Sequence, residues 1–271
     1  MFYYINNILF IHPNFNNELN KKIFEKFINC EKIIFANYRE PTFAKNKYYN
    51  IYEGIYIRQN KSLKRGIYLQ ETTYDVNDYF DTLHDIYIKV KKDCDIYPNY
   101  DKKWYGFDLS RSQFNKQVNN IFPEKITSLI LGWSFNQSVD NLPLSLKEIT
   151  FGYSFNQLVD NLPFNLEIII FGHNFNNPIN NLPNSIKYLL LGTMFNQPID
   201  DLPNTLERLH LGSSFNNQIN NLPIGLLELT STSKYLKKRT DIYHIPENLQ
   251  TINICGKFYA KENLKHIYRI N

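Results

Sequence analysis

The residue types that most often carry catalysis are scattered along this chain. The sequence contains no H-E-x-x-H motif, no P-loop and no G-x-G-x-x-G, and its Ser, Cys and His residues show no spacing that suggests a triad. The histidines form no cluster with the spacing of metal ligands; they are His12, His84, His173, His210, His244 and His266. The sequence therefore predicts a protein that is not an enzyme, with no catalytic residue, no metal site and no cofactor.

Residues suited to binding another protein recur instead at regular positions. They fall in three columns, which lie two, five and seven residues before a repeated Phe-Asn pair. Protein interfaces favour Tyr, Trp and Arg anchors inside a polar rim, and several residues in these columns are of that kind. The predicted partner-binding residues are Trp133, Tyr153, Ile168, Ile170, His173, Tyr188, Leu190, Arg208, Glu148 and His210.

The element that must position these residues is an internal repeat. Its Phe-Asn pairs begin at Phe114, Phe135, Phe155, Phe175, Phe195 and Phe215, so the first interval is 21 residues and the other four are 20. Leu-Pro pairs and single glycines keep the same step, with the prolines at 143, 163, 183, 203 and 223 and the glycines at 132, 152, 172, 192 and 212. A period of this length lies at the short end of leucine-rich repeats, which place one strand in each coil of a horseshoe.

The repeated unit reads L-P-x-x-L-x-x-L-x-L-G-x-x-F-N-x-x-I-D/N-N/D, with Ile, Val and Phe in place of some Leu. It resembles the FNIP repeat, a leucine-rich-repeat variant, over residues 105–226, and "FNNPI" at 175–179 and "FNQPI" at 195–199 match best. The resemblance implies a β-rich solenoid: a horseshoe of about 20-residue coils, with short parallel strands on the concave face and mostly irregular convex segments. It also implies an origin in amoebae or in giant viruses that infect amoebae.

Each position in the unit has an expected role. Leu189 and Leu191 should point into the coil while Leu190 points out, because side chains alternate along a strand. Phe195 should stack on the equivalent Phe of its neighbours, and Asn196 should bond the backbone of the next coil. The glycine ends the strand, where a side chain would obstruct either a tight turn or a positive φ.

The outward positions predict a binding surface on the concave strand face. An exposed apolar patch should occupy the middle of this face, formed by Ile168, Ile170, Tyr188 and Leu190. Trp133 and Tyr153 should extend it as an aromatic stripe, and Glu148 and Arg208 should flank it with opposite charge. The alternative is that these residues pack against a neighbouring loop, the N-terminal segment or a second copy of the chain.

Three segments are predicted along the chain: degenerate N-terminal coils or a cap at 1–104, regular repeats at 105–229, and an irregular coil with a C-terminal cap at 230–271. In the first segment the repeat unit is approximated at 8–20 and 27–35, and strand-like runs follow at 54–58, 66–70 and 85–90. These runs indicate coils that continue the solenoid, and a separate small α+β domain is the alternative. In the last segment a P-x-x-L-x-x-I-x-I pattern at 246–254 predicts one more coil before the cap.

Charge is distributed unevenly along the chain. Residues 127–230 hold three Lys/Arg against eight Asp/Glu, whereas residues 231–271 hold eight against three. The acidic solenoid argues against nucleic acid as a partner of the repeat face. The three cysteines lie far apart without a C-x-x-C, which fits a reducing compartment. No run is long enough to span a membrane and the N-terminus lacks signal-peptide features, so a soluble intracellular protein is expected, in the cytoplasm of an amoeba or of an infected host.

These features together predict a non-enzymatic protein–protein interaction module that binds a partner through its concave strand face. One alternative is a structural protein that assembles with copies of itself. Another is a substrate-receptor subunit of a host ubiquitin ligase, which the resemblance implies because many FNIP-repeat proteins carry an F-box. Residues 17–30 are the nearest F-box candidate, but they lack its Leu-Pro opening, so an F-box is not expected.

Overall fold

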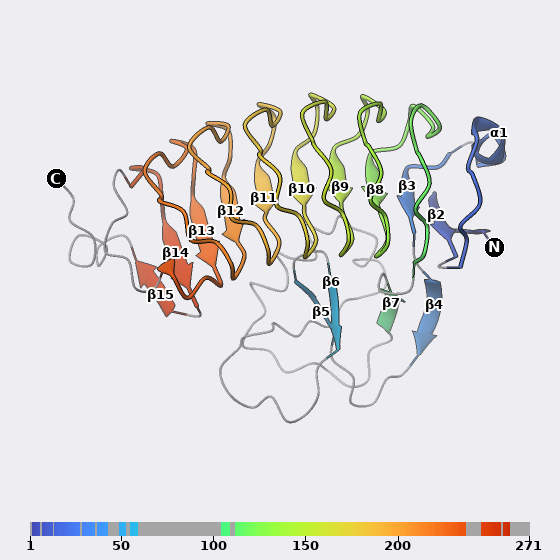
Figure 1. Cartoon of the computed structure of the whole chain (residues 1–271). Helices are drawn as coiled ribbons and strands as arrows, with labels where there is room; N and C mark the ends of the chain where they lie inside the picture. The colour runs from blue at the N-terminus through green and yellow to red at the C-terminus, as the bar shows by residue number, and fades with distance from the viewer. Residues whose placement is uncertain are drawn as a thin grey trace.

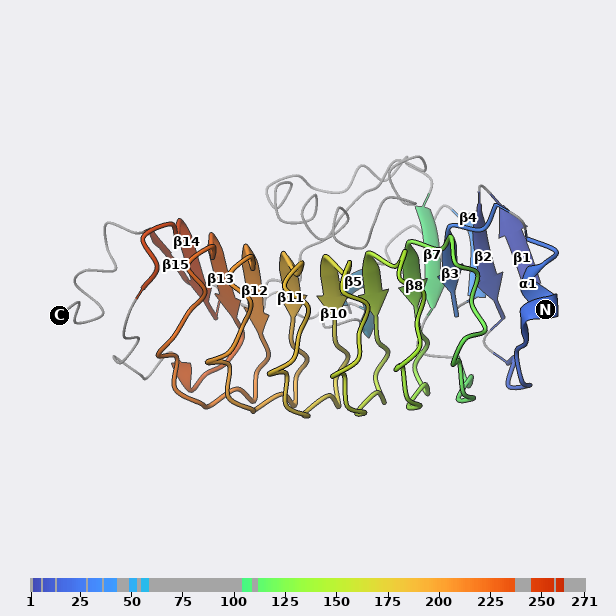
Figure 2. The ribbon, with the colours of Figure 1, turned by 90° about the horizontal axis from the view of Figure 1, so that it is seen from above.

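In the computed structural model of the 271-residue chain, coils stack side by side in a row. Figure 1 shows this row with the N-terminal coils at the right and the C-terminal coils at the left. The residues it describes are 2–5, 7–12, 14–27, 29–35, 37–42, 49–52, 55–58, 104–108, 112–236, 245–255 and 257–260. Figure 2 shows the strands along one side of this row and the irregular part of each coil along the other. Helix is limited, in these residues, to the single turn α1 (Lys21–Phe24).

One sheet runs the length of the row. Its strands, in spatial order, are β1 (Phe2–Ile5), β2 (Ile8–Ile11), β3 (Lys32–Ile34), β8 (Ser128–Ile130), β9 (Glu148–Thr150), β10 (Ile168–Ile170), β11 (Tyr188–Leu190), β12 (Arg208–Leu211), β13 (Glu228–Ser231), β14 (Thr251–Ile254) and β15 (Lys257–Ala260). Neighbours from β2 to β14 are parallel, while β1 and β15 pair antiparallel at the two ends. The predicted solenoid of short parallel strands is therefore confirmed.

The hydrophobic core lies inside the coils, as the alternation along each strand predicts. Leu189 and Leu191 are fully buried in the core cluster. The strand register places each residue beside its equivalent one repeat away, so that Ile169 pairs with Leu189 and Leu189 with Leu209. A repeated residue thus becomes a continuous apolar column, which no single coil could bury alone.

The phenylalanines of the Phe-Asn pairs form a buried spine. Ring centroids of successive residues from Phe114 to Phe215 lie between 6.0 and 6.3 Å apart, with nearly parallel planes. Phe15 extends the spine toward the N-terminal coil, with its ring centroid 6.1 Å from that of Phe114. The predicted stacking of Phe195 on its neighbours is confirmed, and it packs large apolar rings at the spacing of the coils.

The asparagines of the same pairs form a hydrogen-bonded ladder. The Oδ1 atom of Asn196 accepts the backbone N–H of Asn216 at 2.8 Å, as the sequence predicted. The same bond joins each coil to the next along Asn16, Asn115, Asn136, Asn156, Asn176, Asn196 and Asn216. These side chains supply an acceptor to backbone amides that lie outside the strands.

Close approach of neighbouring backbones explains the repeated glycines. A Cβ atom on Gly172 would lie 1.9 Å from the carbonyl oxygen of Gly152, and one on Gly192 would lie 1.7 Å from that of Gly172. Their φ angles lie outside the left-handed region. Of the two predicted reasons, steric obstruction is therefore confirmed and a positive φ is wrong.

The first two coils come from the N-terminal 35 residues. Strands β2 and β3 form where the sequence approximated the repeat unit, and β3 pairs with β8. The chain leaves the solenoid after Phe35, whose N–H donates to the Ile130 carbonyl at 3.0 Å. It has returned by Ser112, whose carbonyl accepts the N–H of Ser134 at 3.1 Å. One coil is thus divided between residues distant in sequence.

Four described strands lie between these two points, outside the long sheet. β4 (Asn37–Thr42) pairs antiparallel with β7 (Trp104–Asp108), and β5 (Tyr49–Tyr52) pairs antiparallel with β6 (Ile55–Arg58). Figure 1 shows both pairs below the row of coils. β6 lies within the predicted strand-like run at 54–58, and it pairs with β5 instead of with a strand of the long sheet. The runs at 66–70 and 85–90 lie outside the described residues.

The C-terminal coil follows the pattern at 246–254. β14 pairs parallel with β13, which confirms the predicted extra coil, and β15 then turns back against β14. In the segment after β13 the sequence lacks the Gly and the Phe-Asn pair of the repeat. There Leu236 packs in the core, and the Ser233 hydroxyl donates a hydrogen bond to the Phe215 carbonyl. Residues 264–268, predicted to close the end of the core, lie outside the described residues.

Candidate functional site

The middle of the strand face is buried in this chain. Ile168 and Ile170 are 8% and 3% exposed, and Tyr188, Leu190 and His210 are each 1% exposed. None of the five belongs to the core cluster inside the coils, so they point outward as predicted. The expectation that they form an exposed patch is nevertheless wrong, because their outer surface is covered.

Burial of the outward positions extends along the sheet through Phe10, Ile34, Ile130 and Thr150. It ends at the last strands, where Thr230 and Asn253 are half-buried and Thr251 is exposed. The centre of the strand face is therefore buried, whereas its end at the last strands is not.

Three predicted residues at the rim of the face form an accessible stack. The rings of Trp133 and Tyr153 lie 4.1 Å apart with planes 7° from parallel, and those of Tyr153 and His173 lie 4.5 Å apart at 3°. All three side chains are half-buried. We call Trp133, Tyr153 and His173 the aromatic stack.

The coil backbone fixes the spacing of the aromatic stack. The carbonyl of each ring-bearing residue accepts an N–H from the next coil: Trp133 from Ser154, Tyr153 from Asn174, and His173 from Met194, each at 2.9 Å. The rings therefore rise by one coil at a time and meet face to face. Because burial disfavours the charged imidazole, the pKa of His173 is lowered.

The two charged residues predicted to flank the patch are half-buried. The Nε of Arg208 lies 3.3 Å from Oε2 of Glu228 on the next strand, so its charge is already paired within the chain. Glu148 lies beside Ile168 in the strand register. These two residues and the aromatic stack are the half-buried members of the predicted set, and the other five are buried.

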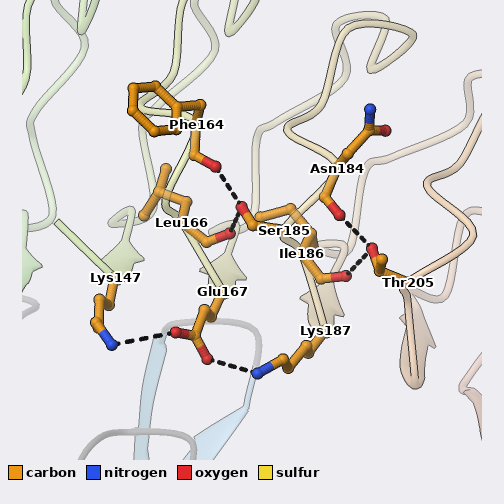
Figure 3. A network of polar contacts seen from close by, with 9 residues as sticks. All are labelled: Lys147, Phe164, Leu166, Glu167, Asn184, Ser185, Ile186, Lys187 and Thr205. Carbon is orange, nitrogen blue, oxygen red and sulfur yellow. Dashed lines mark hydrogen bonds and ion pairs between the residues drawn. The ribbon is translucent and has the colours of Figure 1, made fainter. Parts of the chain in front are cut away.

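A second row of charges precedes the strands. Figure 3 shows Glu167 between Lys147 and Lys187, with oxygen–nitrogen distances of 3.3 and 2.9 Å. The hydrogen bond from Lys187 is the main cause that lowers the pKa of Glu167, and Lys147 adds to it. On the same side, the hydroxyl groups of Ser185 and Thr205 donate to backbone carbonyls of the preceding coil. These contacts join neighbouring coils.

The prediction missed several large apolar side chains on other surfaces of the coils. The exposed ones are Leu144 (55%), Leu158 (57%), Phe164 (64%), Met194 (47%), Ile224 (67%) and Tyr235 (52%). Three of them occupy the position directly after the repeated Pro, which varies from coil to coil. Variation at this position is typical of a surface site, but it does not by itself distinguish an exposed apolar residue from a buried one.

Chemistry at a metal is not supported by the described part of the chain. In these residues no three His, Cys, Asp or Glu side chains are grouped so that they could hold an ion. The described residues also include no helix with the length and apolar character needed to cross a bilayer.

Comparison with known proteins agrees with the geometry. A family model described as FNIP Repeat matches residues 114–154, 155–194 and 195–230. No curated protein matches the chain. Among solved structures, the chain is similar to CroV588, a giant-virus protein described as a circular leucine-rich-repeat structure, with 39% identity and a TM-score of 0.47. That match covers 52% of this chain and only 22% of CroV588. Within this chain, FNIP repeats are found in residues 114–230.

Proposed function

We propose that this chain is a non-enzymatic protein-interaction module, and that a protein partner docks at the rim of the strand face on the aromatic stack. Repeat families of this kind are generally scaffolds without catalytic activity. The solenoid presents neighbouring coils at a constant spacing, so a partner can contact several coils through one continuous surface.

The observation that carries this proposal is the aromatic stack itself. Its rings are held in place by their own contacts and by the backbone bonds beneath them. Side chains that are already ordered lose little conformational freedom on binding, which favours affinity. Trp and Tyr are also the residue types most enriched among residues that dominate binding energy.

Burial at the centre of the strand face favours a docking surface at its rim. Tyr188 and Leu190 are not available to a partner while they are covered. Substitution of either residue by Asp would place a charge in a buried position and destabilise the fold. These two residues are therefore unsuitable for testing binding.

The experiment compares capture of proteins from an amoeba lysate by tagged variants. The double variant Trp133→Ser/Tyr153→Ser removes two rings of the aromatic stack. Leu158→Ser is the matched control, because Leu158 is an exposed apolar residue outside the stack. We expect a partner that the wild type and the control retain and the double variant loses. Equal capture by all three proteins would reject the aromatic stack as the docking surface.

The ubiquitin-ligase alternative receives no support from the described residues. The candidate segment 17–30 contains the single helical turn α1, and Leu19, Phe24 and Cys30 are buried in the solenoid core. These residues complete a coil, which supports a structural role for segment 17–30.

A further inference from the structure

An open groove lies on the surface of the coils, in the segments that lead into β8, β9 and β10. Leu144 and Phe164 form its exposed apolar wall, and the buried Phe122 also lines it. Leu144 and Phe164 occupy equivalent positions in neighbouring coils, and Asn165 Nδ2 donates to the Leu144 carbonyl at 3.0 Å. Among the described residues that line the groove, the charged ones are Glu124 and Asp140. We therefore call it the acidic groove.

An irregularity of the repeat lies beside this groove. The interval from Phe114 to Phe135 is 21 residues instead of 20. The extra residue is accommodated near Asn120, which adopts a left-handed φ of 55° and lines the groove. Asn tolerates this conformation better than most residues. Within the series from Phe114 to Phe215, the irregular interval thus coincides with the groove.

The negative charge of the groove is held in place. Asp140 accepts hydrogen bonds from the Ser138 hydroxyl at 2.5 Å and from Asn161 Nδ2 at 3.1 Å. These bonds lower the pKa of Asp140, with Ser138 as the larger cause, so the carboxylate stays ionised near neutral pH. An apolar wall beside two carboxylates suits an occupant that carries an aromatic ring and a positive charge.

The same chain carries a surface of this complementary chemistry. Tyr235 is 52% exposed in the turn after β13, and the exposed Lys234 precedes it. In the sequence Lys237, Lys238 and Arg239 follow. The C-terminal residues 231–271 hold eight Lys/Arg against three Asp/Glu, whereas the repeats at 127–230 hold three against eight.

We propose that the acidic groove of one copy of this chain binds the Tyr235 turn of a second copy. Within one chain the two surfaces are kept apart, because the coils of β11 and β12 lie between β10 and β13. At the usual strand spacing this separation is about 14 Å along the sheet. The contact joins two different surfaces, so each copy keeps a free groove or a free turn and further copies can add.

Sedimentation velocity of the purified chain from low to high micromolar concentration tests this proposal. We expect species that grow beyond a dimer with concentration. We also expect about 0.5 M NaCl to weaken association, because the Debye length then falls to about 4 Å. A chain that stays monomeric throughout would overturn the proposal and leave the groove to a foreign basic segment.

Two variants separate the partner surfaces. Phe164→Asp alters the groove and Tyr235→Ser alters the turn, and each should weaken association about tenfold or more because an aromatic contact is lost. An equimolar mixture should form a 1:1 dimer, since one chain retains the turn and the other retains the groove. No dimer in the mixture would overturn the heterologous contact.

Ile224→Asp is the matched control for the groove variant. Ile224 is 67% exposed and occupies the position after Pro223, equivalent to that of Phe164. It should change neither the fold nor the association. Circular dichroism of all variants checks folding, and equal loss of association in Ile224→Asp and Phe164→Asp would show that the groove is not the specific contact.

Discussion

Asn196 and Asn216 are joined by a 2.8 Å hydrogen bond between the side-chain Oδ1 of the first and the backbone N–H of the second, one repeat later. The bond is part of a ladder that runs from Asn16 to Asn216. It gives the repeated asparagine a physical role, because the coil turns offer backbone amides that no strand partner satisfies. Contacts between coils of this kind can be tested one residue at a time.

Removal of one rung should weaken the stacking of coils. Asn196→Ala leaves the Asn216 N–H without its side-chain acceptor, and the free energy of unfolding should fall by about 1 kcal/mol. Urea denaturation followed by circular dichroism measures the change. Asn184→Ala is the control, since Asn184 is an exposed asparagine outside the ladder and should have little effect. Equal effects of the two changes would argue against a special role for the ladder.

A methyl group in the glycine column should be poorly tolerated. Gly172→Ala would place Cβ 1.9 Å from the Gly152 carbonyl oxygen, so the two coils must separate. Backbone displacement at a buried contact should lower the free energy of unfolding by about 3 kcal/mol or more. Thermal and urea unfolding check this, with the exposed Ser213→Ala as control. A variant as stable as the wild type would mean that the coils adjust more easily than the contact distance implies.

Cys30 should resist alkylation in the folded protein. It is 1% exposed, and burial raises its pKa to about 11, so little thiolate is present near neutral pH. In a Cys94→Ser background, iodoacetamide at pH 8 should label Cys30 only after denaturation, as mass spectrometry of peptides can show. Rapid labelling of Cys30 without urea would indicate that the N-terminal coil opens under native conditions.

The pH dependence of stability should include a contribution from His173. Because burial lowers its pKa in the folded protein, the unfolded chain binds the proton more readily. This contribution is therefore complete above the unfolded pKa of about 6.5 and is lost as the pH falls toward the folded value. NMR titration should place the His173 pKa below 6.5, and His173→Gln should lose less stability than the wild type between pH 7 and pH 5. A titration at or above 6.5 would contradict the prediction.

The aromatic stack shows how far sequence reasoning reached at the candidate site. Trp133, Tyr153 and His173 share one position of the repeat, so their proximity follows from the period, and the structure adds the face-to-face geometry. Leu144 and Phe164 share another position but were missed, because an exposed apolar residue after Pro cannot be told from a buried one by pattern alone. The pairing of Arg208 with Glu228 was also missed, although the two occupy equivalent positions in adjacent coils.

The architecture of the coil follows from the repeat period alone. Its period places Phe175, Phe195 and Phe215 in one buried column, because each coil repeats the contacts of the one before. The burial of Tyr188 and Leu190, which point away from the core, becomes visible only in the three-dimensional structure. That difference has a physical cause: the direction of a side chain is set by the strand that carries it, whereas its exposure depends on which other atoms the complete fold places against it.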